Sequence, residues 1–134
     1  EGGQRMNGRV NASKIPIIKL GDSLLVPIQV DMTDQVVSDL QNDILNEIGR
    51  TGAKGVLIDI SVLEMVDSFI GRMLSGIARM AAIMDAAVVI VGMQPAVAIT
   101  LVELGLDLKN IDYALNIEDG MTRLKQRIIE GEQA

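Results

Sequence analysis

Apolar residues form five short runs along the chain, and each run predicts a β-strand. The predicted strands are 15–20, 23–28, 55–60, 86–92 and 111–115, of which the last has the weakest pattern. Gly21-Asp22 separates the first two runs by two residues, which predicts a β-hairpin with a tight turn. The runs 55–60 and 86–92 are nearly unbroken, as is typical of strands buried on both faces of a sheet.

Four other stretches carry apolar residues at intervals of three and four, the spacing of one helix face. They predict helices from Thr33 or Asp34, as the N-cap, to about Gly49–Gly52, from about 68 to 84, from 96 to 104 and from 117 to 130. The predicted buried stripe of the first helix is Val36, Val37, Leu40, Ile44, Leu45 and Ile48. That of the second helix is Ile70, Met73, Ile77, Met80 and Met84. A methionine-rich stripe more often fills a core than marks a special surface.

The predicted elements follow one another in the order β-β-α-β-α-β-α-β-α, without a repeat or an internal linker. A hairpin followed by right-handed crossovers predicts an α/β domain with a mixed, mostly parallel sheet that four helices cover. We expect this single domain to span residues 15–131. Residues 1–14 are rich in glycine and basic residues and lack an apolar run, so a disordered N-terminal tail is predicted there.

Composition narrows the possible functions. Of the 134 residues 49% are hydrophobic, which is enough for one core, and only Phe69 and Tyr113 are aromatic, so the core is expected to be aliphatic. The net charge of −6 argues against a nucleic-acid partner, which requires a clustered basic face. The segment 86–93 is too short to span a bilayer, and residues 1–14 lack the apolar core of a signal peptide. We therefore expect a soluble, cytoplasmic protein without membrane or nucleic-acid partners.

The sequence contains no recognisable catalytic constellation. It has no histidine, no cysteine and no glycine-rich phosphate loop, so we expect neither an enzyme nor a bound cofactor or metal. The strongest enzymatic alternative is a receiver domain, because Leu57-Ile58-Asp59 resembles the strand-end aspartate of that family. A receiver also needs an acidic pair after its first strand and a lysine-proline that ends its last strand, and neither is present.

The candidate functional residue is Ser68, where the chain leaves the buried run 55–60, crosses a short acidic turn and enters the second predicted helix. A serine in the first turn of a helix faces backbone N–H groups without an intrahelical partner, at the positive end of the helix dipole. A phosphate on that serine adds about 1.5 to 2 negative charges and would be held there. The alternative is that Asp67 or Ser68 only caps the helix, as these residue types commonly do.

Several motifs resemble the STAS family, the anti-sigma-factor antagonists. These motifs are Lys14-Ile15-Pro16-Ile17, Leu24-Leu25-Val26, Ile58-Asp59, Val66-Asp67-Ser68-Phe69-Ile70, Gln94-Pro95-Ala96-Val97-Ala98 and Leu104-Gly105. The resemblance covers residues 14 to about 130 and implies a single STAS domain whose phosphorylated serine is Ser68. Simple antagonists usually continue Asp-Ser with another serine and a glycine, whereas Phe69 and Ile70 follow here, which fits the stressosome branch of the family.

The resemblance also implies a function. It implies a scaffold that captures a switch serine/threonine kinase and releases it once Ser68 is phosphorylated. The other implied partners are larger STAS-containing sensor paralogues, further copies of the chain in a large complex, and a phosphatase that acts on the phosphoserine.

A dry contact surface around Ser68 would give this mechanism a physical basis. Phe69 and Ile70 are expected to pack against the kinase, although Phe69 is close enough to the helix start to point either inward or outward. An added phosphate would place charge in that interface. Asp67 is expected to bind the kinase or to position the serine hydroxyl. Asp22, in the hairpin turn, is expected near the same edge in contact with the partner, although an aspartate in a turn is more commonly solvated. The remaining alternative is a small-molecule or nucleotide-binding STAS module that uses the same helix start.

Overall fold

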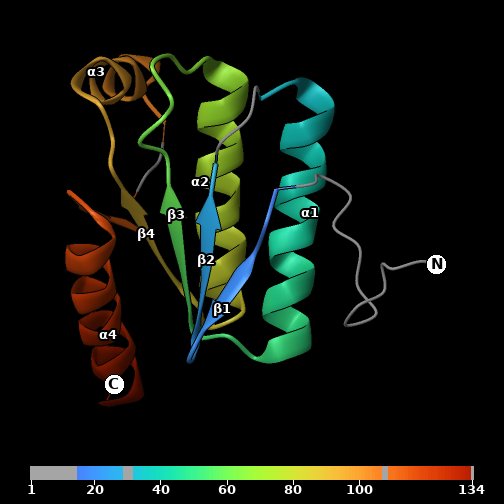
Figure 1. Ribbon diagram of the computed structural model, residues 1–134, viewed down its shortest axis with the longest axis vertical. Coiled ribbons are helices and arrows are strands. Elements are labelled where there is room, and N and C mark those ends of the chain that lie inside the picture. Colours follow the sequence, from blue (N-terminus) through green and yellow to red (C-terminus); the bar gives the residue numbers. More distant parts are fainter. Residues whose placement is uncertain (1–14, 29–31, 107–108, 134) are drawn as a thin grey trace.

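The computed structural model describes residues 15–28, 32–106 and 109–133, which form one sheet and four helices (Figure 1). The strands are β1 (Ile18–Leu20), β2 (Ser23–Pro27), β3 (Gly55–Asp59), β4 (Ala87–Val91) and β5 (Ile111–Ala114). The helices are α1 (Asp34–Thr51), α2 (Ser68–Ile83), α3 (Pro95–Leu104) and α4 (Ile117–Gln133). The predicted order of elements is confirmed, whereas the disorder predicted for residues 1–14 concerns a segment outside the described ranges.

The strands lie in the order β1-β2-β3-β4-β5, and only the first pair is antiparallel. In the turn between β1 and β2, Gly21 has a φ of +60°, a conformation that glycine adopts without strain. The strands from β2 to β5 are parallel because a helix crosses over between each successive pair. The predicted mixed, mostly parallel sheet is confirmed. Its four parallel strands end at the same edge, where the connections to the four helices begin.

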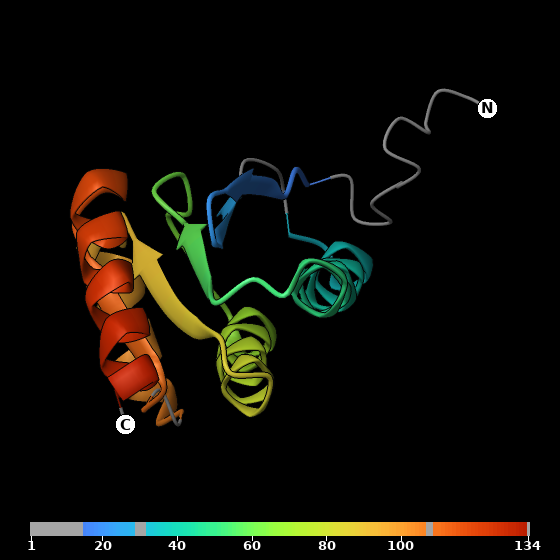
Figure 2. The same cartoon turned by 90° about the horizontal axis from the view of Figure 1, so that it is seen from below.

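The helices cover the two faces of the sheet differently. Figure 2 shows α1 and α2 on one face and α4 on the other. α3 packs beside α2, and α4 packs on β3, β4 and β5. In β3, Val56 and Ile58 belong to the large core cluster on the side of α1 and α2, whereas Leu57 packs with Leu124 of α4. This alternation follows from the two-residue period of a strand.

The ends of α1 follow local sequence signals. The Thr33 hydroxyl accepts a hydrogen bond of 3.3 Å from the N–H of Val36, so Thr33 is the N-cap. Gly52 ends the helix with a φ of +69°, and its N–H donates to the carbonyl of Ile48 at 2.9 Å. The predicted stripe is buried at Val37, Leu40, Ile44 and Ile48 and partly buried at Val36 and Leu45.

α2 buries more of its surface than the predicted methionine stripe. Ile70, Met73 and Ile77 are buried as predicted, but Met84 is exposed. The prediction for Met84 is wrong because α2 ends at Ile83 and the chain turns there toward β4. Further buried residues of α2 are Gly71, Leu74, Ser75, Gly76, Ala78 and Ala81. The helix is apolar on so many sides because it touches the sheet, α1 and α3.

Within the described ranges, none of the helices combines the length and apolar character that a membrane crossing requires.

A candidate phosphorylation site at the start of α2

A loop of residues 60–67 connects the end of β3 to the start of α2. The N–H of Ile60 donates to the carbonyl of Val91 at 3.0 Å, which ties the loop to the end of β4. The N–H of Ser61 donates to Oδ1 of Asp59 at 2.9 Å, and Nε2 of Gln94 donates to the carbonyl of Ser61 at 2.9 Å. The first half of the loop is therefore fixed against two neighbouring segments.

Asp67 is the N-cap of α2. Its backbone is extended, with a φ of −111° and a ψ of −178°. Its Oδ1 accepts a hydrogen bond of 2.9 Å from the N–H of Ile70, and its carbonyl accepts one of 3.0 Å from the N–H of Gly71. The carboxylate thus satisfies one of the N–H groups that a helix start leaves unpaired. Of the two residues that the sequence allows as the cap, Asp67 has this role.

Ser68 is the first residue of α2, and its side chain is half-buried. No residue in the described part of the chain makes a hydrogen bond to its hydroxyl. Because Asp67 caps the helix, the fold does not need this hydroxyl. A group can therefore be added to the oxygen without breaking a hydrogen bond of the domain.

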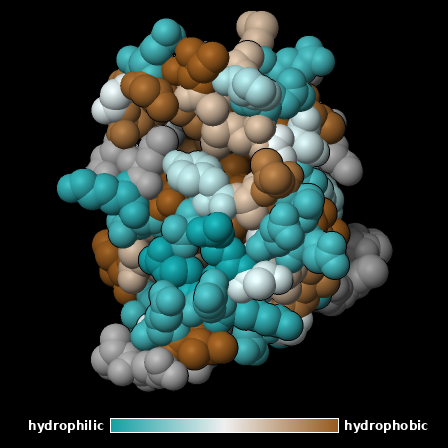
Figure 3. All heavy atoms as spheres, turned by 90° about the vertical axis from the view of Figure 1, so that its left-hand side faces the viewer, coloured by the Kyte–Doolittle hydropathy of each residue, from teal (hydrophilic) through white to brown (hydrophobic). Residues whose placement is uncertain are grey.

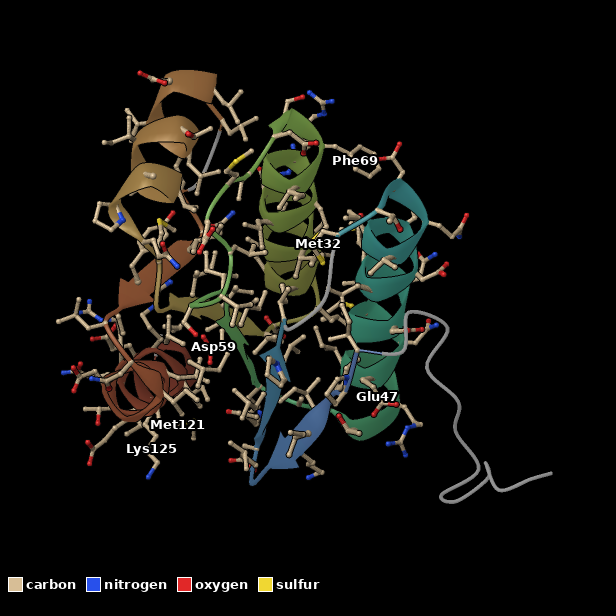
Figure 4. All side chains as sticks on the ribbon, turned by 45° about the horizontal axis from the view of Figure 1, so that its top comes forward. Met32, Glu47, Asp59, Phe69, Met121 and Lys125 are labelled. Carbon is tan, nitrogen blue, oxygen red and sulfur yellow. The ribbon has the colours of Figure 1, made fainter. Side chains whose placement is uncertain are left out.

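The two apolar residues after Ser68 belong mainly to the domain's own core. Ile70 is buried in the large core cluster, and Phe69 is partly buried against it. Figure 4 shows Phe69 pointing from the start of α2 toward the start of α1. Ile70 falls on the inward face because it continues the buried stripe of Met73 and Ile77 at helical spacing. Ile70 therefore belongs to the predicted buried stripe and does not provide the partner contact that is also expected of it, and Phe69 provides only a part of that contact.

The exposed apolar side chains near Ser68 come from the preceding loop. Val62 is 55% exposed and Met65 is 82% exposed. Neither exposure is predictable from the sequence, because a loop has no periodicity that separates inward from outward residues. Their only signal is an apolar residue type in an acidic turn within six residues of Ser68. Glu64 and Asp67 are exposed as well, so the surface before α2 combines apolar and acidic groups.

The structure does not bring Asp22 to this site. Asp22 lies in the turn before β2, where Ser23 pairs with Gly55 at the beginning of β3. Its carbonyl accepts a hydrogen bond of 2.7 Å from the N–H of Lys54. Ser68 instead follows the far end of β3 (Figure 1). The hairpin turn returns to the start of the parallel strands, and Asp22 is consequently at the opposite end of the domain.

A hollow of about 440 Å³ lies at the ends of β3 and β4, lined in part by Asp59, Ser61, Asn116 and Glu118. No residue of the first turn of α2 lines it. Two carboxylates there would repel the phosphate groups of a nucleotide. The hollow therefore lends no support to the nucleotide-binding alternative.

The fold is a small α/β domain in which a serine, whose hydroxyl has no hydrogen bond within the described ranges, directly follows the aspartate that caps α2. The chain belongs to the STAS domain family, whose profile matches residues 14–120. Among curated protein sequences, none gives a significant match.

Several solved structures are similar to the chain. RsbS from Moorella thermoacetica, in a variant with a serine-to-glutamate substitution, is 42% identical, covers 84% of this chain and 96% of its own, and has a TM-score of 0.77. A chain in a structure of the stressosome, described as a signal integration and transduction hub, is 43% identical over 83% of this chain and 96% of its own, with a TM-score of 0.74. The anti-sigma factor antagonist SpoIIAA in its unphosphorylated form is 13% identical, with coverages of 84% and 96% and a TM-score of 0.70, and shows the fold alone.

Proposed function

We propose that this STAS domain is a scaffold that captures a switch serine/threonine kinase and releases it when the kinase phosphorylates Ser68. The observation that carries the proposal is the free hydroxyl of Ser68 at the start of α2, beside a cap that Asp67 supplies. The similarity to an RsbS variant with a serine-to-glutamate substitution supports it, because that change introduces a negative charge at a serine, as phosphorylation does.

The proposed kinase contact, here called the capture surface, consists of Val62, Met65, Asp67, Ser68 and the exposed part of Phe69. Met65 has the most exposed apolar side chain of this set, and methionine adapts its shape to a partner easily. Ile70 supports this surface from the core. Asp22 would contact a partner only through a second surface, at the other end of the domain.

Release follows from the charge of the phosphate. Phosphorylation adds about 1.5 to 2 negative charges in the middle of the capture surface, next to the Asp67 carboxylate. A kinase that buries this surface would have to desolvate the charge, which costs several kcal/mol as an order of magnitude. The helix N-terminus stabilises the same charge in the free domain, so the fold survives the modification while the complex does not.

We also propose that the domain assembles with larger STAS-containing sensor paralogues and with further copies of itself, and that a phosphatase restores Ser68. The 43% identity to a chain of the stressosome supports the assembly. The helix α3 supports the assembly as well. Its only charged residue is Glu103, and its apolar side chains Ile99 and Val102 are 59% and 78% exposed, so it presents an apolar surface. Figure 3 shows the side of the molecule that is on the left in Figure 1, where α3 lies above α4. Hydrophobic residues gather toward the top of this side, and hydrophilic residues lie below, over α4.

The kinase-binding affinities of four forms test the capture mechanism. Calorimetry should give Ser68→Ala the affinity of the wild type, and Ser68→Asp an affinity lower by about tenfold or more, since about 1.4 kcal/mol corresponds to a factor of ten. The enzymatically phosphorylated domain should bind still more weakly, because aspartate carries only about one charge. Ser38→Asp, which adds the same charge to an exposed serine of α1, should bind like the wild type. Equal affinities for all forms would remove Ser68 from the mechanism.

The site of modification tests the same proposal independently. After incubation with the cognate kinase and ATP, mass spectrometry should find phosphate chiefly on Ser68. Ser75 is buried, and the Thr100 hydroxyl already donates to the carbonyl of Ala96 at 3.0 Å. Ser61 is exposed and is the informative competitor. Phosphate on Ser61 with Ser68 unmodified would contradict the proposal.

A further inference from the structure

A single basic side chain lies near Ser68 in the chain. Residues 60–75 contain one cation, Arg72, and two acidic residues, Glu64 and Asp67. Arg72 is exposed on α2, four residues after Ser68. Side chains four residues apart in a helix are neighbours on the same face. In the part of the chain that the structure describes, the Arg72 guanidinium has neither a hydrogen bond nor an ion pair.

We propose that Arg72 is the internal counter-ion of a phosphate on Ser68, an inference that rests on the phosphorylation proposed above. The planar guanidinium presents paired N–H donors that match two phosphate oxygens. It is one helical turn from the serine oxygen, and no other interaction of the fold has to break before it binds. The phosphate therefore receives a cation from its own helix.

The neighbouring carboxylate explains why such a cation is needed. Asp67 carries a negative charge directly before Ser68, and its Oδ1 is held in place by the N–H of Ile70. A dianionic phosphate beside it is repelled, and the helix start and Arg72, the one cation of residues 60–75, offset this repulsion. Pairing with the phosphate also removes the single cation that the unmodified helix start offers to a partner. Phosphorylation then changes the charge at the start of α2 twice, by adding an anion at Ser68 and by pairing Arg72.

The other arginines of α1 and α2 are either too far from Ser68 along the helix or already engaged. Arg79 is also exposed on α2, but it follows Ser68 by eleven residues, which places it about 16 Å further along the helix axis. Arg50 of α1 is already engaged, with Nη2 at 2.8 Å from Oε1 of Glu47 and Nε at 3.1 Å from Oε2. Arg79 therefore serves as a control with the same chemistry, helix and exposure.

A phosphate titration tests the pair without a kinase. Phosphoserine is incorporated at position 68 during synthesis, and the second pKa of the phosphate is followed by phosphorus NMR between about pH 4 and 8. A nearby cation favours the dianion and lowers this pKa, so Arg72→Gln should raise the midpoint by about half a pH unit. Arg79→Gln should leave it unchanged. Equal midpoints in the wild type and Arg72→Gln, or equal shifts in both variants, would overturn the proposal.

Thermal melts separate this role from a role in folding. Without the phosphate, Arg72→Gln should have the melting temperature of the wild type, because Arg72 has no partner in the described structure. The phosphorylated form of Arg72→Gln should melt below the phosphorylated wild type, whereas phosphorylated Arg79→Gln should not. Neither measurement involves the kinase. A kinase that does not phosphorylate Ser68 would therefore refute the proposed function but not the pairing of Arg72 with the phosphate. Unchanged midpoints of the phosphate titration would refute the pairing alone.

Discussion

Asp67 and Ser68 are adjacent residues with separate tasks at one helix start. The Asp67 carboxylate accepts the hydrogen bond from the N–H of Ile70, while the Ser68 hydroxyl has no hydrogen bond to any residue that the structure describes. This division lets a phosphate be added or removed without changing the cap. It also means that a substitution of Asp67 mixes two effects, helix stability and charge at the capture surface.

Two substitutions of Asp67 separate these effects. Asp67→Ala should lower the free energy of unfolding by about 1 kcal/mol, because the N–H of Ile70 loses its acceptor. Asp67→Asn keeps an acceptor oxygen and should stay close to the wild type. Urea denaturation measures both, and Thr33→Ala, which removes the cap of α1, is the reference for the loss of a cap. If Asp67→Asn keeps its stability but loses kinase binding, the charge itself contacts the partner; equal destabilisation by both variants would contradict the capping role.

Tyr113 offers a clean optical signal, because it is the single tyrosine in a chain without tryptophan. Partial burial raises its pKa above the usual value of 10.0, and the nearby Asp112 carboxylate raises it further. The neutral phenol is thus favoured in the fold, so its contribution to stability is present below about pH 10 and is lost as the pH rises through the raised pKa.

An absorbance titration of folded and unfolded chain checks this. The folded midpoint should lie above the unfolded one, and Asp112→Asn should lower it, because one of the two causes is removed. A folded midpoint equal to that of the unfolded chain would show that burial does not affect the phenol.

At the scale of elements, local signals are predictable from the sequence and the mutual placement of elements is not. The cap at Thr33 and the glycine at Gly52 are readable because each acts within a few residues. The inward position of Ile70 is predictable as well, because it continues the apolar stripe of α2 at helical spacing. The exposure of Met65 depends on how a loop without periodicity lies on the surface. The distance between Asp22 and Ser68 depends on the direction of the parallel strands.

Two glycines in helices show the same difference between local and tertiary effects. A Cβ at Gly71 of α2 would lie 2.5 Å from Cδ1 of Leu106 and 3.3 Å from Cδ2 of Leu101, whereas a Cβ at Gly131 of α4 would meet nothing within 4 Å. Helix propensity favours alanine equally at both positions, by up to about 1 kcal/mol. At Gly71 the Cβ would meet the ends of leucine side chains, and overpacking that these side chains do not relieve costs about 1–3 kcal/mol.

The two alanine variants should therefore change stability in opposite directions. Gly71→Ala should lower the free energy of unfolding, and Gly131→Ala should raise it, as measured by urea denaturation. Because Leu101 and Leu106 lie in and directly after α3, Gly71→Ala should also displace α3 from α2. A stabilising Gly71→Ala would show that this contact between α2 and α3 adapts without cost.

At the scale of the whole molecule, the candidate phosphorylation site and α3 lie at the same end of the domain. Gly71, three residues after Ser68, approaches leucines in and after α3. The start of α2 and the helix α3 therefore share one end of the domain. The hairpin turn with Asp22 is at the other end. A kinase that occupies the capture surface is consequently held next to the surface that we assign to assembly.

The assembly can be tested with charges placed at the two ends of the domain. Light scattering on a mixture with a STAS-containing sensor paralogue should show a particle far larger than either component. Val102→Asp should abolish it, because a charge on the exposed side of α3 would have to be buried without a partner. Ile83→Asp carries the same kind of change on an 83% exposed side chain at the far end of α2 and should assemble like the wild type.

Both positions are exposed, so melting temperatures should stay near that of the wild type and exclude misfolding as the cause. A wild-type mixture that remains at the mass of a monomer or dimer would contradict the assembly, and equal losses with both variants would remove α3 as its specific surface.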